Sequence, residues 1–383
     1  MTTREELFEK VDAILPAIAE RRRYVGEHGI IHPDTLKECD EIGLMKTLIP
    51  KKYGGFELDV ETMAGIIRRI SGNCMSSGWI TAFFIGHNWM VTRFNEKTQD
   101  DVFKDNPSPK VPGQIRPTIA AKKVTGGFEL TGRSHWNSGI LQGDWLLTGI
   151  MVEGEGPKLA LVKAGDFEID EVWDMSAMEG TGSHDMICDK TFVPEHRIAE
   201  IEGFMIGKTE GTALYDNPLY SLPVLPFIYT EAVGVFVGGL EGATQHFINM
   251  LNGSDPTYSP GKLAEMSTVH TKIGEAAARA NAARKLSDAL IREIMTTQAS
   301  SGITLEDRIR MKVDAGFLIN HCRESINSLI HNAGARSFEN KSPIQAFFRD
   351  INTLSVHAFW DWVVCREQYG RNQVGLDPTH PLI

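Results

Sequence analysis

The run Trp-Leu-Leu-Thr-Gly-Ile-Met-Val at residues 145–152 marks the middle of the chain as β structure. Its aromatic and β-branched residues suit a pleated, half-buried surface, and the shorter runs at 127–131 and 159–162 have the same character. Gly, Asp and Pro interrupt these runs at the short intervals typical of an antiparallel sheet or barrel. We therefore predict an antiparallel, β-barrel-like domain over residues 110–215.

The sequence on both sides of this region has helical periodicity. Before it, apolar residues recur three and four positions apart, as at Leu7, Val11 and Ile18, which predicts a helical domain over residues 1–109. After it, long alanine-rich helices are expected to form a four-helix bundle over residues 216–383. The predicted bundle helices cover 228–251, 262–295, 305–333 and 344–369. The chain is thus predicted to be an α+β protein in three parts.

Composition and charge exclude several classes of protein. With 383 residues, of which 42% are apolar and 23% charged, the chain has the size and usage of a soluble globular protein. No apolar run reaches the roughly 18 residues that a membrane span needs. The net charge of -11 opposes binding to nucleic acid or anionic lipid, so we expect a small-molecule partner. The charged N-terminus lacks the apolar segment of a secretory signal, which indicates a cytoplasmic protein.

The cysteines give no support for a disulfide framework or a zinc site. They are odd in number and form no CxxC pair, so we interpret them as small core residues and expect no metal. Motifs for dinucleotide binding, phosphate loops, zinc proteolysis and serine hydrolysis are likewise not found in the sequence. The five cysteines are Cys39, Cys74, Cys188, Cys322 and Cys365.

The order of a helical domain, a β domain and a helical bundle, together with several short motifs, resembles the acyl-CoA dehydrogenase superfamily over nearly the whole chain. In that superfamily a flavin lies between the β domain and the bundle, and a neighbouring subunit completes the site. The resemblance therefore implies a flavoprotein and a homotetramer. The matching motifs are His32-Pro33, Gly43-Leu44, Pro50, Tyr53-Gly54-Gly55, Trp136-Asn137-Ser138, Trp145, Phe192-Val193-Pro194, Pro343 and Arg349-Asp350.

Two departures separate the chain from the dehydrogenases themselves. Their catalytic glutamate matches Lys341 here, and a cation cannot remove a proton from a thioester. Their flavin- and thioester-binding segment is replaced by the shorter stretch 113–117, so the coenzyme A site is not preserved. Two alternatives stay open. They are a dehydrogenase with a relocated base and a non-catalytic scaffold of the same fold. Some dehydrogenases carry the glutamate on another helix, which keeps the first of them open.

Other motifs resemble the flavin-dependent aromatic hydroxylases of this fold, which include the oxygenase components for 4-hydroxyphenylacetate and for the phenolic ring of steroid catabolism. The resemblance implies that a separate NAD(P)H:flavin reductase supplies reduced flavin, FMNH2 or FADH2. With O2 this flavin forms a C4a-hydroperoxide, which hydroxylates a phenol- or indole-like aromatic substrate. The sequence does not decide between FMN and FAD. The motifs are Met75-Ser76-Ser77-Gly78-Trp79, Gly86-His87-Asn88-Trp89, Gly180-Thr181-Gly182-Ser183 and His357.

The cofactor candidates follow from this resemblance. Ser138 matches the hydroxyl residue that contacts flavin N5, which makes it both a cofactor-binding and a catalytic candidate; its alternative is a turn serine. Trp136 is expected near the ring system, or else in the core of the β domain. Asn137 lies between the two and is a further cofactor candidate.

The loop Gly180-Thr181-Gly182-Ser183 is the second cofactor candidate. Its backbone N–H groups and two hydroxyls suit the flavin edge, the ribityl chain or a phosphate, although a plain tight turn has the same residues. Glu179 stands where related hydroxylases carry a basic residue, which weakens the phosphate role. Arg336 is expected to reach the phosphate tail of a neighbouring subunit's cofactor, its alternative being a solvated arginine.

Two histidines are the candidates for proton transfer. His357, placed on the last predicted helix, is expected over the flavin, where a near-neutral pKa would let it exchange a proton with a phenol or a peroxide. His87 lies in an apolar helix and would need a hydrogen bond there; it is the second catalytic candidate, with a structural role as the alternative. Phe84, Trp89 and Gln114 are expected to line the same substrate pocket.

Overall fold

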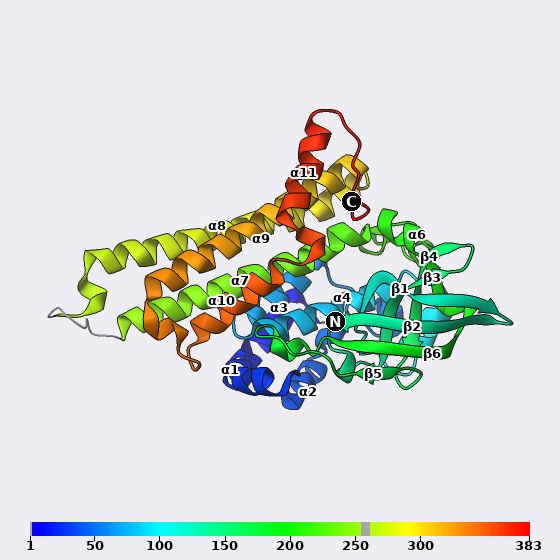
Figure 1. The fold of residues 1–383 in the computed structure, drawn as a ribbon, viewed down its shortest axis with the longest axis horizontal. Coiled ribbons are helices and arrows are strands. Elements are labelled where there is room, and N and C mark those ends of the chain that lie inside the picture. The colour runs from blue at the N-terminus through cyan, green and yellow to red at the C-terminus, as the bar shows by residue number, and fades with distance from the viewer. Residues whose placement is uncertain (1, 254–260) are drawn as a thin grey trace.

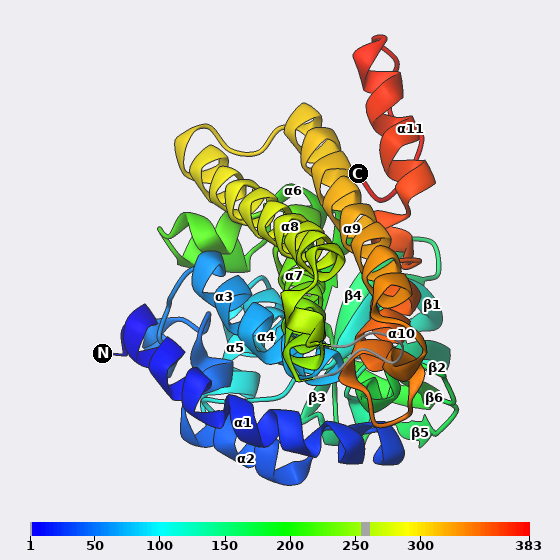
Figure 2. The same cartoon turned by 90° about the vertical axis from the view of Figure 1, so that its left-hand side faces the viewer.

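The computed structural model describes residues 2–253 and 261–383, and it has the predicted order of helices, sheet and helices (Figure 1). Long helices make up one end of the molecule and the sheet the other, with the N-terminal helices beside both (Figures 1 and 2). The N-terminal helices are α1 (Arg4–His28), α2 (Pro33–Glu41), α3 (Val60–Ser71), α4 (Met75–Val91) and α5 (Glu96–Phe103).

Local sequence explains where these helices begin and how closely they pack. Helix α1 begins at Arg4 because Thr3 and Glu6 form a reciprocal capping box. Helix α3 packs against α7 (Val224–Asn252) at backbone distance: a Cβ at Gly238 would lie 2.2 Å from the carbonyl oxygen of Arg68. Only glycine permits this approach. Helix α4 is consequently enclosed, and Phe83 alone among its residues is partly exposed.

The sheet has seven strands in the order β5-β6-β2-β1-β3-β4-β7. The prediction of a purely antiparallel sheet is wrong at one place, since β1 and β3 pair in parallel. The chain that leaves β2 crosses to the far side of β1, so β3 runs against β2 but along β1. The strands are β1 (Gly113–Val124), β2 (Gly127–Asn137), β3 (Trp145–Val152), β4 (Gly156–Lys163), β5 (Glu168–Asp170), β6 (His184–Pro194) and β7 (Ile198–Glu200).

Alternation along the strands divides the apolar residues between two cores. Leu146 and Ile150 of β3 lie in a small core inside the sheet domain, whereas Leu147 of the same strand belongs to the large core of the helices. The N-terminal helices and the bundle share that large core. The three-part division at residues 109 and 215 therefore stays a proposal.

The C-terminal helices are α6 (Ile201–Ile206), α7 (Val224–Asn252), α8 (Ser267–Ser300), α9 (Leu305–Ala333), α10 (Pro343–Leu354) and α11 (Trp362–Gln373). Helix α7 is long and apolar enough to cross a membrane, which corrects the expectation that no segment is, but 94% of its most apolar window is buried inside the protein. A core helix has this property.

The predicted helix over 344–369 is wrong, because the chain breaks between α10 and α11. His357 caps a 3-10 turn, Ala358–Trp360, by accepting a hydrogen bond at Nδ1 from the Phe359 N–H. Asp361 then caps α11 by accepting from the N–H groups of Val363 and Val364. Two capping side chains within five residues stop one helix and start another. His357 thus lies in the break and not on a helix.

Candidate active site

One face of α4 carries an aromatic stripe. Trp79, Phe83 and His87 are spaced four residues apart and therefore lie above one another. The ring centroids are 4.8 Å apart between Trp79 and Phe83, and 4.6 Å apart between Phe83 and His87, which stack. Since Phe83 is the only partly exposed residue of α4, this face is where the helix borders accessible space.

The break between α10 and α11 meets this stripe at Trp79. His357 stacks on Trp360 at 4.7 Å between centroids and lies edge-on to Trp79 at 6.4 Å. The structure thus brings together His87 and His357, which are distant in sequence, at the two ends of one aromatic wall. The wall consists of His87, Phe83, Trp79, His357 and Trp360.

The two histidines carry their protons on different nitrogens. His87 donates from Nδ1 to the carbonyl oxygen of Val111 at 2.8 Å, so its Nε2 is a bare acceptor. His357 uses Nδ1 as an acceptor for the Phe359 N–H at 3.3 Å, so its Nε2 carries the proton. The neutral imidazoles therefore present opposite functions, one acceptor and one donor.

Desolvation keeps both imidazoles neutral. Desolvation lowers the pKa of His87 to about 4. Hydrogen bonding to the Val111 and Pro112 carbonyls acts in the opposite direction, because it favours the charged form, but it is the smaller effect. Desolvation also lowers the pKa of His357 to about 4, which corrects the expectation of a near-neutral value. His357 is nevertheless exposed to solvent.

A chain of hydroxyl groups starts at the same tryptophan. The indole Nε1 of Trp79 lies 3.2 Å from Ser138 Oγ, which lies 2.8 Å from Ser183 Oγ. Ser183 Oγ is 2.7 Å from Thr181 Oγ1, and Thr181 donates to the carbonyl oxygen of Met178 at 2.9 Å. The structure thus joins Ser138, after β2, to the loop 180–183 through direct contacts.

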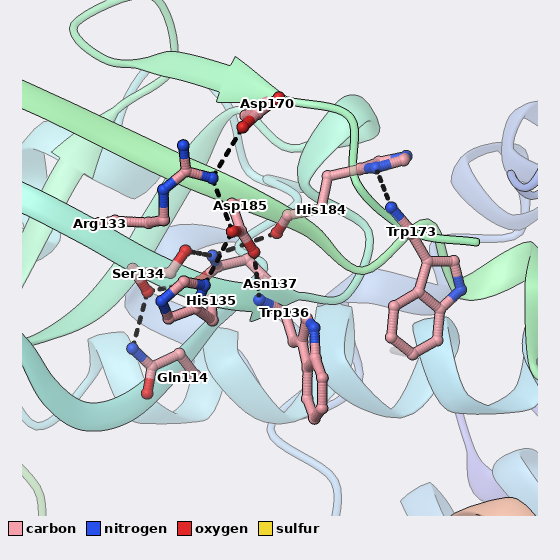
Figure 3. A network of polar contacts seen from close by, with 10 residues as sticks. All are labelled: Gln114, Arg133, Ser134, His135, Trp136, Asn137, Asp170, Trp173, His184 and Asp185. Carbon is pink, nitrogen blue, oxygen red and sulfur yellow. Dashed lines mark hydrogen bonds and ion pairs between the residues drawn. The ribbon is translucent and has the colours of Figure 1, made fainter. Parts of the chain in front are cut away.

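Trp136 lies near the end of β2, at the irregularity between Ser134 and Asn137, where a buried carboxylate holds the strand (Figure 3). Its backbone has a left-handed φ of 60°, and its N–H donates to Asp185 Oδ1 at 3.1 Å. Asp185 Oδ2 accepts from Arg133 at 2.9 Å and from His135 at 2.8 Å. Burial alone would raise the pKa of Asp185, but these hydrogen bonds outweigh burial and lower it.

This end of β2 presents an aromatic side chain to solvent. The side chain of Trp136 is 65% exposed, so its alternative role as a core residue is wrong. Its indole and that of Trp173 project to the same side of the sheet, with centroids 6.1 Å apart (Figure 3). Trp173 is half-buried and meets Trp136 edge-on, so the exposed indole of Trp136 is the apolar surface that a planar ring can cover.

The amides of Asn137 and Gln114 bond to groups of the sheet domain (Figure 3). Asn137 is fully buried and donates to the carbonyl oxygens of Ser134 and His184, at the irregularity between β2 and β6. Gln114 donates to Ser134 Oγ at 2.7 Å and to the carbonyl oxygen of Arg116 at 3.0 Å. Both residues therefore shape the strand that leads to Ser138.

The loop 180–183 is packed against α1. Gly182 has a φ of 47°, and a Cβ there would lie 2.6 Å from the carbonyl oxygen of Gly29, so this position requires glycine. Thr181 and Ser183 are 2% and 3% exposed, and their hydroxyls belong to the chain that reaches Ser138. These hydroxyls are consequently shielded from water.

Adjacent residues of α10 hold the two residues that directly precede this loop, Met178 and Glu179. Asp350 Oδ1 accepts from the N–H of Met178 at 2.7 Å, and Arg349 forms an ion pair of 2.6 Å with Glu179. We call these two contacts the α10 clamp. Burial raises the pKa of Asp350 to about 7, although the Met178 hydrogen bond opposes this shift. Glu179, which replaces the basic residue of related hydroxylases, thus has a cationic partner from the bundle.

Several predicted site residues lie elsewhere. Trp89 is two positions from His87 and so points to the opposite side of α4, where it stacks on Phe227 at 3.7 Å and donates to the Leu219 carbonyl oxygen. Phe84 is fully buried under Gly139. Neither lines the aromatic wall.

Arg336 and Lys341 both lie on the surface of the chain. Arg336 is exposed in the turn after α9, and its side chain has no hydrogen bond or ion pair to the part of the chain that the structure describes. Lys341 pairs with Glu339 at 3.1 Å. Within a single chain neither residue contacts Ser138 or the histidines.

A relocated carboxylate base would need access to a substrate. Glu231 of α7 is 3% exposed, and its Oε1 has no hydrogen-bond partner within residues 2–253 and 261–383. Desolvation raises its pKa well above the ordinary value, so it is protonated. An enclosed carboxylic acid of this kind does not act as the base of a dehydrogenase.

The structure adds Trp79, Phe83 and Trp360 to the predicted residues. The helical signal that reveals two of them is the four-residue spacing back from His87 to Phe83 and Trp79. Trp360 gives no such signal, because its position depends on the break before α11.

The available groups fit a flavin, which combines a planar apolar ring with polar edges. The exposed indole of Trp136 and the accessible ring of His357 offer flat surfaces. Ser138 offers a hydroxyl; it follows Trp136 by two residues and is linked to His357 through Trp79. Apolar surfaces, one hydroxyl group and two neutral histidines are together suited to bind such a ring.

Comparison with known proteins gives one consistent answer. The acyl-CoA dehydrogenase N-terminal domain model matches residues 3–102, and the C-terminal domain model matches residues 232–362. A pigment production hydroxylase of Rhodococcus sp. (strain ATCC 21145) is 36% identical, covering 100% of this chain and 99% of its own. The oxygenase component of p-hydroxyphenylacetate 3-hydroxylase of Acinetobacter baumannii is 25% identical over 98% and 91% of the two chains.

A solved structure extends the likeness to the whole fold. XiaF from Streptomyces sp., in complex with FADH2 and glycerol, is 25% identical, has a TM-score of 0.91 and covers 99% of this chain and 98% of its own. The sequence matches and the fold agree along the full length of the chain. The chain belongs to the acyl-CoA dehydrogenase family and, within it, to the flavin-dependent monooxygenases that serve as oxygenase components.

Proposed function

We propose that this oxygenase component hydroxylates a small aromatic or heteroaromatic substrate, phenol- or indole-like, beside the aromatic wall. The observation that carries the proposal is the pair of neutral histidines with opposite proton positions at the two ends of that wall. A phenol or an indole has a flat apolar face and one polar hydrogen. Both features are complementary to this surface.

Reduced flavin, when bound, would supply the two electrons that activate O2, so that one oxygen atom enters the substrate and the other leaves as water. Ser138 would meet its polar edge, and Trp136 and the loop 180–183 would hold its ring and ribityl parts. The cation nearest the loop, Arg349, is paired with Glu179 and is therefore not free to bind a phosphate. We therefore assign the phosphate to Arg336 of a neighbouring subunit in a homotetramer, and FMN and FAD remain equivalent candidates.

The proton roles follow from the two tautomers. The bare Nε2 of His87 accepts a hydrogen bond from the O–H of a phenol or the N–H of an indole, which makes the ring more electron-rich. The Nε2–H of His357 donates a hydrogen bond to a developing oxyanion, a role that needs no near-neutral pKa. Phe83, Trp79 and Trp360 exclude water between the two sites, which strengthens both interactions.

Reconstitution with a flavin reductase tests this proposal. Purified protein, NADH, reductase and a panel of phenols and indoles in ¹⁸O2 should yield a product with one labelled oxygen atom, and purified protein should be nearly colourless. Ser138→Ala should release more hydrogen peroxide per product. Oxidation of an acyl thioester with dye reduction, in the absence of reductase, would instead support the dehydrogenase alternative. A protein that binds no flavin would support the scaffold alternative.

A further inference from the structure

The chain of hydroxyls behind Ser138 has a defined direction. It runs from Trp79 Nε1 through Ser138, Ser183 and Thr181 to the carbonyl oxygen of Met178, with separations of 3.2, 2.8, 2.7 and 2.9 Å. Each hydroxyl has one proton to donate, the indole N–H only donates, and a carbonyl only accepts. The two ends therefore decide how every proton between them is placed.

Counting begins at the carbonyl. Thr181 gives its proton to Met178, an oxygen that also accepts from Thr181 N–H and Trp173 Nε1. Ser183 must then donate to Thr181, and Ser138 must donate to Ser183. Trp79 supplies the hydrogen bond that Ser138 accepts. The single proton of Ser138 is thus already used, and its oxygen retains one lone pair.

Shielding from water preserves this arrangement. Ser138, Thr181 and Ser183 are 6%, 2% and 3% exposed. Water therefore has little access to supply or remove a hydrogen bond within the chain, and a fully satisfied buried network of this kind is stiff. Ser138 is thus held as an acceptor by two hydroxyls that are themselves buried.

We propose that Ser183 and Thr181 make the site selective for reduced over oxidised flavin, by holding Ser138 as an acceptor. The inference rests on the proposed function, in which Ser138 meets flavin N5. Reduced flavin carries a hydrogen on N5 and finds an acceptor in Ser138. Oxidised flavin has a bare N5 that needs a donor, which Ser138 does not provide. The same contact therefore favours entry of the reduced form and departure of the oxidised form.

Flavin binding in both oxidation states tests the proposal without turnover. Dissociation constants for oxidised FMN and FAD, and for the reduced forms under anaerobic conditions, give a ratio Kd(oxidised)/Kd(reduced) for each variant. Thr181→Val removes the acceptor of Ser183, whose proton then turns to Ser138 and frees the Ser138 proton. Ser183→Ala frees the same proton directly. A hydrogen bond is worth about 1 kcal/mol, so each variant should lower the ratio about fivefold.

Thr181→Ser is the matched control, because it keeps a hydroxyl at the same place and should keep the wild-type ratio. The two disruptive variants remove different hydroxyls. If circular dichroism shows that only one of them folds, that variant alone is sufficient to test the proposal. Wild-type preference for reduced flavin that survives in both Thr181→Val and Ser183→Ala overturns this inference and leaves the proposed function intact. Wild-type protein that binds flavin in neither state contradicts the proposed function itself.

Discussion

Helix α4 and the break between α10 and α11 each contribute one histidine, and they prepare it in different ways. In α4 a continuous, enclosed helix turns His87 toward a carbonyl of another segment, Val111. In the break His357 bonds to its own backbone two residues further on. Both imidazoles are neutral, yet only one presents a proton. The difference shows that the backbone around a histidine, and not its pKa alone, decides which chemistry it offers.

The largest effect should come from removing either histidine. His87→Ala and His357→Ala should each slow hydroxylation by about 10²- to 10⁴-fold, the range for a positioned proton donor or acceptor. His87→Gln retains an acceptor and should recover part of the loss, whereas Gln at position 357, which also has N–H donors, should recover more. His331→Ala, at an exposed position of α9, is the control. The measurement is the rate of hydroxylation in a single turnover. Equal rates in wild type and both alanine variants would refute the roles assigned to His87 and His357.

Acid pH should separate the two regions by stability. The folded-state pKa of His87 is about 4, below the unfolded value of about 6.5, so the unfolded state binds more protons as the pH falls through this window. The free energy of unfolding should decrease by up to about 3 kcal/mol between pH 6.5 and 4 because of His87. Urea titrations should show a weaker pH dependence in His87→Gln. Exposed His357 should contribute less, so an equal change in His357→Gln would contradict the comparison.

Removing the cap of α11 should alter the break without touching an imidazole. Asp361→Ala removes the acceptor of two backbone N–H groups and should lower the free energy of unfolding by about 1 kcal/mol. Thr304→Ala removes the equivalent cap of α9 and should have a similar effect on stability. Only Asp361→Ala should also slow hydroxylation, because it loosens His357. Identical kinetics in the two variants would show that the break does not position this histidine.

The smallest effect should come from the ring that connects the two regions. Phe83→Leu keeps an apolar side chain but loses the stacking on His87, a contact worth about 0.5–1.5 kcal/mol. We expect KM for the aromatic substrate to rise a few-fold with kcat nearly constant. A fall in kcat with unchanged KM would instead indicate that Phe83 orients His87.

The sequence predicted the fold well where periodicity decides it and poorly where distant contacts do. The alternating and helical patterns gave the three regions, but the parallel pairing of β1 with β3 depends on where the chain crosses the sheet. The helical pattern continues through residues 355–361, so the break was missed, although Asp361 before Trp362 is a capping signal.

The candidate site divides in the same way. Family resemblance selected His87, His357 and Ser138, and the structure connects all three through Trp79. Trp89 was expected to line the same pocket as His87, but two residues along a helix turn a side chain by about 200°. The roles of these residues stay predictions. Their proton positions depend on Val111 and Phe359, partners that no sequence pattern indicates.

The α10 clamp has a consequence for how mutations combine. Arg349 and Asp350 are adjacent, and so are Met178 and Glu179, so either contact brings the other pair together at a high effective concentration. The conformational entropy that is lost when this segment becomes ordered is therefore lost only once for the two contacts. Disrupting one contact should therefore weaken the other. A double-mutant cycle of Arg349→Ala and Asp350→Ala should show losses that are not additive.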